Sequence, residues 1–134
     1  MTRIVFALFI VAHGLIHASY VAPRPAPTAG GPAWPFELGR SWLLSPLGVT
    51  ESVLRPLGIG LAILAVAAFA LAGLATLGIV LPVGAWQPLV VGGAIASLAL
   101  LGLFFHPWLV LGIAIDLVLV GVIWRADWTP EGLT

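Results

Sequence analysis

The chain has 134 residues, of which 61% are hydrophobic and only 7% are charged. Soluble domains carry about 25% charged residues, and a domain of this length cannot bury so much apolar surface in its own core. Five arginines and five acidic residues give zero net charge, with no lysine and no cysteine. The composition therefore indicates an integral membrane protein in contact with the lipid bilayer. It excludes thiol chemistry by the chain itself and a clustered basic surface for nucleic acid.

Four apolar stretches are each long enough to cross a bilayer: residues 4–22, 57–80, 87–105 and 108–124. About 20 helical residues span the ~30 Å hydrocarbon layer. The first stretch could instead be a signal peptide, because Arg3 precedes its apolar core. However, the apolar run continues past two histidines and favours a spanning helix. We predict one all-α transmembrane domain over residues 1–134, an antiparallel bundle of four helices.

Prolines and glycines mark the ends of these helices. Residues 81–84 (LPVG) should end the second helix, because proline cannot continue the hydrogen-bond ladder and glycine accepts turn conformations. Pro88 suits the first turn of the third helix, and Pro107 suits that of the fourth, after a tight turn at His106. Pro56 should kink or restart the second helix. Links this short predict antiparallel neighbours.

The one long connection, residues 23–50, begins with a run rich in proline and glycine and then becomes aromatic. Trp34 and Trp42 favour the headgroup zone of a bilayer. We therefore expect this loop to lie along the interface as a cap between the first two helices. Arg40 stands three residues from Glu37, which predicts a surface ion pair, with control of access to the bundle as the alternative.

The orientation of the chain depends on few charges. Arg3 directly precedes the first helix and favours a cytoplasmic N-terminus, whereas Arg24, Arg40 and Arg55 on the side of the long loop favour the opposite orientation. Because the first helix often dominates, we predict a multi-pass protein with both termini in the cytoplasm.

Asp116 is the only formally charged side chain between Pro56 and Trp124. It lies near the middle of the fourth stretch, where a charge costs at least ~2.5–3.5 kcal/mol on insertion scales. Such a residue persists when it faces protein, water or a partner, or when it is protonated. Asp116 is therefore the first candidate for a functional residue.

Two histidines and a serine can reach the depth of Asp116. The histidines are four residues apart on one face of the first helix, and the rise of ~1.5 Å per residue places His13 and Ser97 near the middle of their stretches. Tyr20 continues the histidine stripe toward the long loop. We expect a buried polar cluster and, at the loop end, a rim and cap; the cluster comprises His13, His17, Ser97, Tyr20 and Asp116, and the rim and cap comprise His106, Trp34, Arg40 and Trp42.

Such a cluster has a functional and a structural interpretation. Chains of ionisable groups in membranes mark proton relays, cofactor ligands or substrate sites, and this one would run from His13 and Asp116 through His17 to His106 or Tyr20. Alternatively, Asp116 and a histidine satisfy each other and fix the helix register. The histidine spacing also allows one metal ion to bind, although zinc would need His106 or Asp116 as a further ligand. One histidine would suffice for haem.

Small residues repeat at four-residue spacing in the third stretch, as Gly92 with Ala96 and Gly93 with Ser97. Such pairs let helix backbones approach closely. Tight packing within one bundle and a self-association face are both compatible with this pattern.

Three segments resemble a group of small bacterial four-helix membrane proteins found in actinobacteria and their relatives. These segments are a His-Gly-x-x-His element (His13, Gly14, His17), a Trp-Pro-Phe…Arg-Ser-Trp loop (Trp34, Pro35, Phe36, Arg40, Ser41, Trp42) and a His-Pro-Trp…Ile-Asp element (His106, Pro107, Trp108, Ile115, Asp116). The resemblance covers most of the chain and implies the four-helix fold and a bacterial cell membrane. A looser likeness to DoxX-type proteins implies a link with membrane oxidoreductase complexes. Neither resemblance implies a mechanism.

Three classes of function fit these features. The leading hypothesis is a small binding or accessory subunit that holds an apolar ligand, a lipid, a quinone or a partner helix beside the histidines and Asp116, in a homo-oligomer or a larger membrane complex. The first alternative is an oligomeric proton-coupled transporter or channel that uses Asp116 with His13 and His17. The second is a membrane enzyme, or a redox subunit that binds haem or a metal through the histidine pair. No motif for a nucleophile or a cofactor favours the enzyme.

Overall fold

The computed structural model describes residues 1–23, 26, 29–31 and 34–126, apart from the side chains of residues 125 and 126. Arg24, to which a role in orientation was assigned, lies outside the described residues. Within them the fold is all-helical and contains no strand, as predicted. The elements are α1 (Thr2–Ile16), η1 (His17–Tyr20), η2 (Ser45–Leu47), α2 (Glu51–Leu77), η3 (Val83–Ala85), α3 (Trp86–Leu103), η4 (Pro107–Leu109) and α4 (Val110–Ala126), where η marks a short 3-10 turn.

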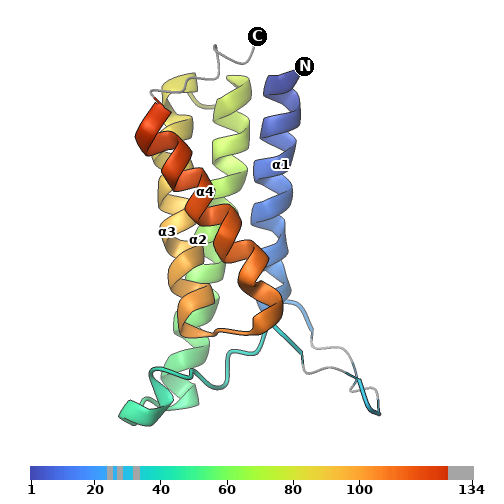
Figure 1. Cartoon of the computed structure of the whole chain (residues 1–134), viewed down its shortest axis with the longest axis vertical. Helices are drawn as coiled ribbons and strands as arrows, with labels where there is room; N and C mark the ends of the chain where they lie inside the picture. The colour runs from blue at the N-terminus through green and yellow to red at the C-terminus, as the bar shows by residue number, and fades with distance from the viewer. Residues whose placement is uncertain (24–25, 27–28, 32–33, 127–134) are drawn as a thin grey trace.

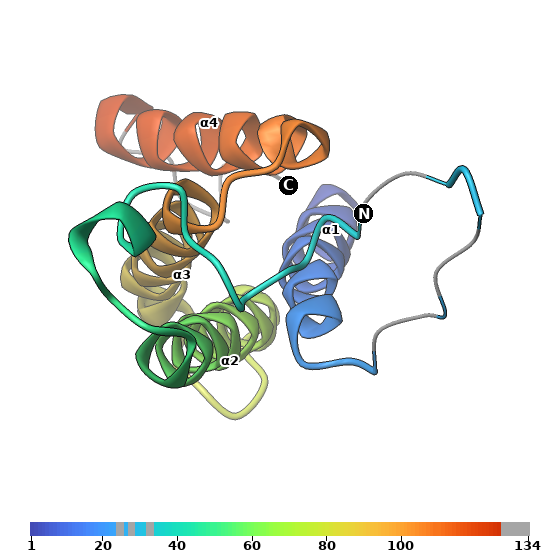
Figure 2. The ribbon, with the colours of Figure 1, turned by 90° about the horizontal axis from the view of Figure 1, so that it is seen from below.

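Four of the described helical segments are long and apolar enough to cross a membrane: Thr2–Tyr20, Glu51–Leu77, Val83–Leu103 and Pro107–Trp124. In sequence order, α1 packs on α2, α2 on α3 and α3 on α4. The first three helices stand side by side, and α4 crosses obliquely over α3 (Figure 1). Seen from below, α4 lies on the far side of α3 from α2 (Figure 2).

The second helix differs from its predicted range at both ends. Its first turn begins at Glu51 with Thr50 at the N-cap position, before the apolar stretch 57–80, and the helix continues through Pro56 without restarting there. A proline in the second turn removes one backbone donor but leaves the rest of the ladder intact. The helix ends at Leu77, three residues before the prediction, because Gly78 adopts the left-handed conformation with φ 70°. Glycine accepts this conformation at no steric cost, and it ends helices for that reason.

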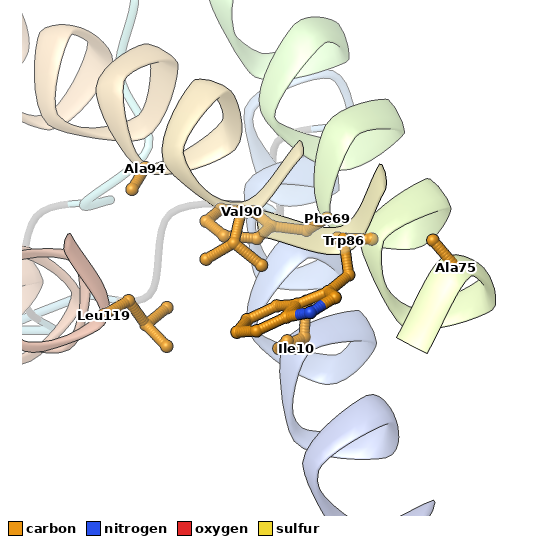
Figure 3. Close-up of a cluster of buried hydrophobic side chains, with 8 residues drawn as sticks. Ile10, Phe69, Ala75, Trp86, Val90, Ala94 and Leu119 are labelled. Carbon is orange, nitrogen blue, oxygen red and sulfur yellow. The ribbon is translucent and has the colours of Figure 1, made fainter. Parts of the chain in front are cut away.

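Two clusters of buried apolar side chains fill the bundle at different depths. The upper cluster, toward the top of Figure 1, centres on Trp86, which lies beside Ile10 and below Phe69 and Val90 in the view of Figure 3. Phe6 meets the Trp86 indole edge-on, with ring centroids 5.7 Å apart. The lower cluster lies toward the long loop, and its buried members are Tyr20, Leu38, Leu54, Ala62, Leu100, Leu101, Phe104 and Leu109.

Close approach between α1 and α2 depends on two glycines. A Cβ atom added at Gly14 would lie 2.6 Å from the Phe69 Cβ, and one added at Gly73 would lie 2.5 Å from the Val11 Cγ2. In α3, Gly93 packs against Phe69 in the same way, whereas a Cβ at Gly92 would meet nothing within 4 Å. Gly93 and its partner Ser97 are therefore used for packing within this chain.

The segment after the proline-rich run is docked against the bundle. The Ser41 hydroxyl donates to the Leu103 carbonyl at 2.6 Å, and the Trp42 indole N–H donates to the Gly102 carbonyl at 2.6 Å. These carbonyls belong to the last turn of α3, where a helix leaves acceptors without internal partners. We call the two side-chain bonds the cap attachment. Arg40 is exposed, and the Glu37 carboxylate accepts a hydrogen bond from the Gly39 backbone N–H.

Candidate functional site

Six polar or charged side chains are buried among the described residues: His13, His17, Ser41, Thr76, Ser97 and Asp116. The hydroxyls of Ser41 and Thr76 donate to backbone carbonyls. The other four side chains, from four different elements, bond to one another. We call these four residues the polar layer: His13 of α1, His17 of η1, Ser97 of α3 and Asp116 of α4.

Asp116 is the centre of the polar layer and is fully buried, with 0% of its surface exposed. Its Oδ1 atom lies 2.8 Å from Nε2 of His13. Its Oδ2 atom is hydrogen-bonded to the Ser97 hydroxyl. Both carboxyl oxygens are therefore satisfied by side chains from other helices, as a buried acid requires.

His17 closes the other end of the polar layer. Its Nε2 atom lies 2.6 Å from the Ser97 Oγ, while its Nδ1 atom faces the backbone carbonyls of His13 and Gly14 at 3.2 and 3.3 Å. The α-helix changes to a 3-10 turn at this residue. Both ring nitrogens of His17 are consequently engaged inside the protein.

The two histidine rings are held in place by aromatic contacts. Phe69 of α2 lies edge-on to His13 with ring centroids 5.0 Å apart, and it is tilted over His17 at 6.3 Å. Phe9 stacks on the other side of His13. Phe69 can approach this closely because Gly14 and Gly93 have no side chains. Sequence reasoning missed Phe69, since nothing in an apolar helix distinguishes one phenylalanine that supports imidazoles from another that fills the core.

The polar layer lies between the two apolar clusters along the bundle. Three residues before His13 is Ile10 of the upper cluster, and three after His17 is Tyr20 of the lower one. Hydrogen bonds in such surroundings are electrostatically stronger than in water, and an unpaired polar group costs more. The predicted depth match of His13, Ser97 and Asp116 is thus seen as direct contact.

Tyr20 is buried but does not belong to the polar layer, so the predicted continuation through it is wrong. Its ring packs edge-on against Phe36 with centroids 5.1 Å apart. Among the described residues its hydroxyl has no hydrogen-bond partner. The cause is its surroundings, because α2 and α3 present only apolar side chains at the depth of the lower cluster.

The predicted rim residues lie apart from the polar layer as well. His106 precedes η4, and its Nδ1 accepts from the Trp108 backbone N–H at 3.2 Å, so it caps the start of the fourth helical segment. Trp34 packs against Phe36, with ring centroids 5.2 Å apart. Trp42 belongs to the cap attachment, as described above.

The metal hypothesis for the histidine pair fits this geometry poorly. Nowhere in the described part of the chain do three or more His, Cys, Asp or Glu side chains form a group able to hold a metal ion. The nitrogens that would serve as ligands instead face the Asp116 carboxyl, the Ser97 hydroxyl and backbone carbonyls. Both His17 nitrogens are engaged in this way, so the ring fits a role as a haem ligand equally poorly.

An apolar groove of about 210 Å³ lies directly beside the polar layer. One wall is formed by η1 and the residue after it, and the other by the middle of α2. The lining residues are His17, Ala18, Val21, Ala62, Ile63, Val66 and Ala67. The groove exists because the side chains of Ala18, Ala62 and Ala67 are small. The sequence could not predict it, since these residues come from two segments that meet only in the folded chain.

Comparisons of the chain with models of known protein families, with curated proteins and with solved structures found no match. Function is therefore inferred from the polar layer and the groove themselves.

Proposed function

We propose that this chain is an integral protein of the bacterial cell membrane and acts as a small binding or accessory subunit. In this proposal its four helices cross the bilayer as an antiparallel bundle with both termini in the cytoplasm, and the segment around Trp42 lies in the headgroup zone. The outward faces of the helices support insertion, since they carry many exposed large apolar side chains, among them Leu8, Ile63, Ile95, Leu111 and Val118. Contact of such surfaces with lipid tails is favourable, whereas their contact with water is not.

The observation that carries the functional proposal is the position of His17, which is both the end of the polar layer and part of the groove wall. Ligand sites are mostly apolar cavities with a few well-placed polar groups. The groove is lined almost entirely by apolar atoms. It therefore suits the hydrocarbon chain of a lipid or of a quinone-type amphiphile. The proposed role is to hold such a chain beside the His/Asp cluster, with a larger membrane complex as the setting.

A phospholipid with a photoreactive group in its acyl chain tests this proposal. After reconstitution in nanodiscs and illumination, labelled peptides should map to the two groove walls, around Ala18 and Ala67, several-fold more than to the outward face of α4. Ala67→Leu should reduce that labelling by filling the groove. Ala114→Leu is the matched control, because Ala114 is exposed on α4 and lies outside the groove. Even labelling over all outward faces, unchanged by Ala67→Leu, would count against a binding groove.

The transporter alternative has narrower support. Its favourable observation is that a carboxyl, a hydroxyl and two imidazoles form one hydrogen-bonded chain. Among the described residues, however, this chain does not continue to the long-loop end of the bundle, because Tyr20 and His106 stand apart from it. Proton flux through liposomes that is abolished by Asp116→Asn would promote this alternative over the binding subunit.

A further inference from the structure

The hydrogen-bond geometry of the polar layer restricts where its protons lie. Nδ1 of His17 faces two backbone carbonyl oxygens, at 3.2 and 3.3 Å. A carbonyl oxygen only accepts hydrogen bonds, so Nδ1 must carry a proton. The protonation of His17 then depends on Nε2 alone: with a proton there the ring is a cation, and without one it is neutral.

Ser97 has one proton to donate and two neighbours within hydrogen-bond distance. Its Oγ is hydrogen-bonded to Oδ2 of Asp116 and lies 2.6 Å from Nε2 of His17. The hydroxyl can donate to only one of them, so the other must donate to Ser97. Either Asp116 is protonated and donates while Ser97 donates to a neutral His17, or a cationic His17 donates while Ser97 donates to an ionised Asp116.

These two arrangements contain the same number of protons and have the same net charge of zero when His13 is neutral and donates from Nε2 to Oδ1. They are exchanged by two coupled transfers. The proton on Asp116 Oδ2 moves to Ser97 Oγ as the Ser97 proton moves to His17 Nε2, so each oxygen and nitrogen keeps a hydrogen bond throughout. No donor or acceptor from outside the polar layer is needed.

The surroundings favour the uncharged arrangement. Separating a carboxylate and an imidazolium inside an apolar bundle costs several kcal/mol per ion before their attraction is counted. Against the polar layer α2 presents the ring of Phe69. No charged residue lies in α3, and Asp116 is the only one in α4 as far as Trp124. At this depth α1 and η1 contribute only His13 and His17.

We propose that Asp116 and His17 exchange a proton through the Ser97 hydroxyl, with protonated Asp116 and neutral His17 as the resting state. The polar layer is then a proton-holding site whose charge can appear and disappear without exchange with the solvent. Ser97 is a positioning and relay residue in this site. The proton exchange depends on the polar layer alone and not on an occupant of the groove. The lipid-labelling experiment can therefore fail while the proton exchange stands, and the proton exchange can fail while lipid binding stands.

Infrared and nitrogen NMR spectroscopy of the purified protein test the resting state. At neutral pH, when exposed carboxyls are ionised, the carbonyl stretch of a protonated carboxylic acid should be present. Carbon-13 aspartate should shift this band, and because the chain has only two aspartates, its persistence in Asp127→Asn assigns it to Asp116. Nitrogen-15 histidine should show His17 with a proton on Nδ1 and none on Nε2. Either absence of the acid band or a cationic His17 would overturn the assigned resting state.

The relay itself is tested at Ser97. In the wild type, Asp116→Leu removes the donor to the Ser97 hydroxyl and should change the Nε2 resonance of His17, because the change is transmitted through the hydroxyl. In a Ser97→Ala background the same substitution should leave that resonance unchanged, and Ser97→Thr should restore the response. A response of equal size without the hydroxyl would overturn the relay. Where Asp116→Leu fails to fold, the shift of the aspartate band caused by Ser97→Ala and its reversal by Ser97→Thr decide the same question.

Discussion

The polar layer and the cap attachment are two regions in which polar bonds join segments far apart in the chain. In the cap attachment, Ser41 and Trp42 donate to carbonyls in the last turn of α3. Any helix end leaves such acceptors free, so a donor there answers a need of the backbone. In the polar layer most bonds run between side chains, and only those of His17 Nδ1 reach carbonyls near the end of α1. Ser97 and Asp116 lie within helices whose backbone groups are already paired.

This difference predicts that the fold needs the bonds of the cap attachment but not those of the polar layer. Apolar side chains of similar volume at the positions of Asp116 and His13 would pack without cost to the backbone, and replacing buried ion pairs in this way often stabilises a protein. Nothing comparable replaces Ser41, because the Leu103 carbonyl would remain. We therefore expect the fold to depend on the cap attachment and to tolerate apolar replacement of the polar layer.

The largest expected effect is at Asp116, and it tests this contrast directly. Asp116→Ala leaves the buried His13 imidazole without its acceptor and the buried Ser97 hydroxyl without its partner, so we expect the free energy of unfolding to fall by about 3 kcal/mol. Unfolding in mixed detergent micelles, followed by tryptophan fluorescence, measures this loss. The double substitution His13→Leu with Asp116→Leu removes both partners and should recover much of it. A double variant as unstable as the single one would mean that the fold itself needs the polar layer.

The support of the polar layer by Phe69 gives the next effect. Gly14→Ala places a Cβ 2.6 Å from the Phe69 Cβ, and this overpacking should lower the free energy of unfolding by about 2 kcal/mol. Phe69 must then move away from the histidine rings, so the His13 and His17 resonances should shift as well. Gly92→Ala is the matched control, since its Cβ meets nothing within 4 Å, and it should stabilise α3 by about 0.5–1 kcal/mol through helix propensity. Equal losses for the two variants would contradict a specific contact at Gly14.

Much of this arrangement could be predicted from the sequence because it depends on depth. Counting along each apolar stretch placed His13, Ser97 and Asp116 at one level, and a lone carboxyl in an apolar bundle must find the available polar partners at that level. The contact of Asp116 with both residues follows from these two facts. The presence of four helical segments long and apolar enough to cross a membrane was also predictable, because it depends only on the apolar stretches of the sequence.

The remaining features depend on what neighbouring helices present, which one sequence stretch does not reveal. Tyr20 follows His17 by one 3-10 turn, about 6 Å along the axis, and at that level α2 and α3 offer only apolar side chains. His106 was expected at a functional rim. Its backbone is extended before Pro107, however, and its side chain accepts a hydrogen bond from the backbone N–H of Trp108. The end of α2 was misplaced because Gly78 ends the helix before the proline at residue 82 can do so.

The smallest of the three effects belongs to the cap attachment and should be confined to it. Ser41→Ala removes the donor to the Leu103 carbonyl and the acceptor for the Leu44 N–H, so the free energy of unfolding should fall by about 1 kcal/mol. The carboxylic acid band and the histidine resonances of the polar layer should be unchanged. Arg55→Gln is a reference for no effect, because the Arg55–Glu51 pair is exposed and such pairs contribute little. If Ser41→Ala altered the spectra of the polar layer, the two regions would be coupled, and the cap would have to be counted as part of the site.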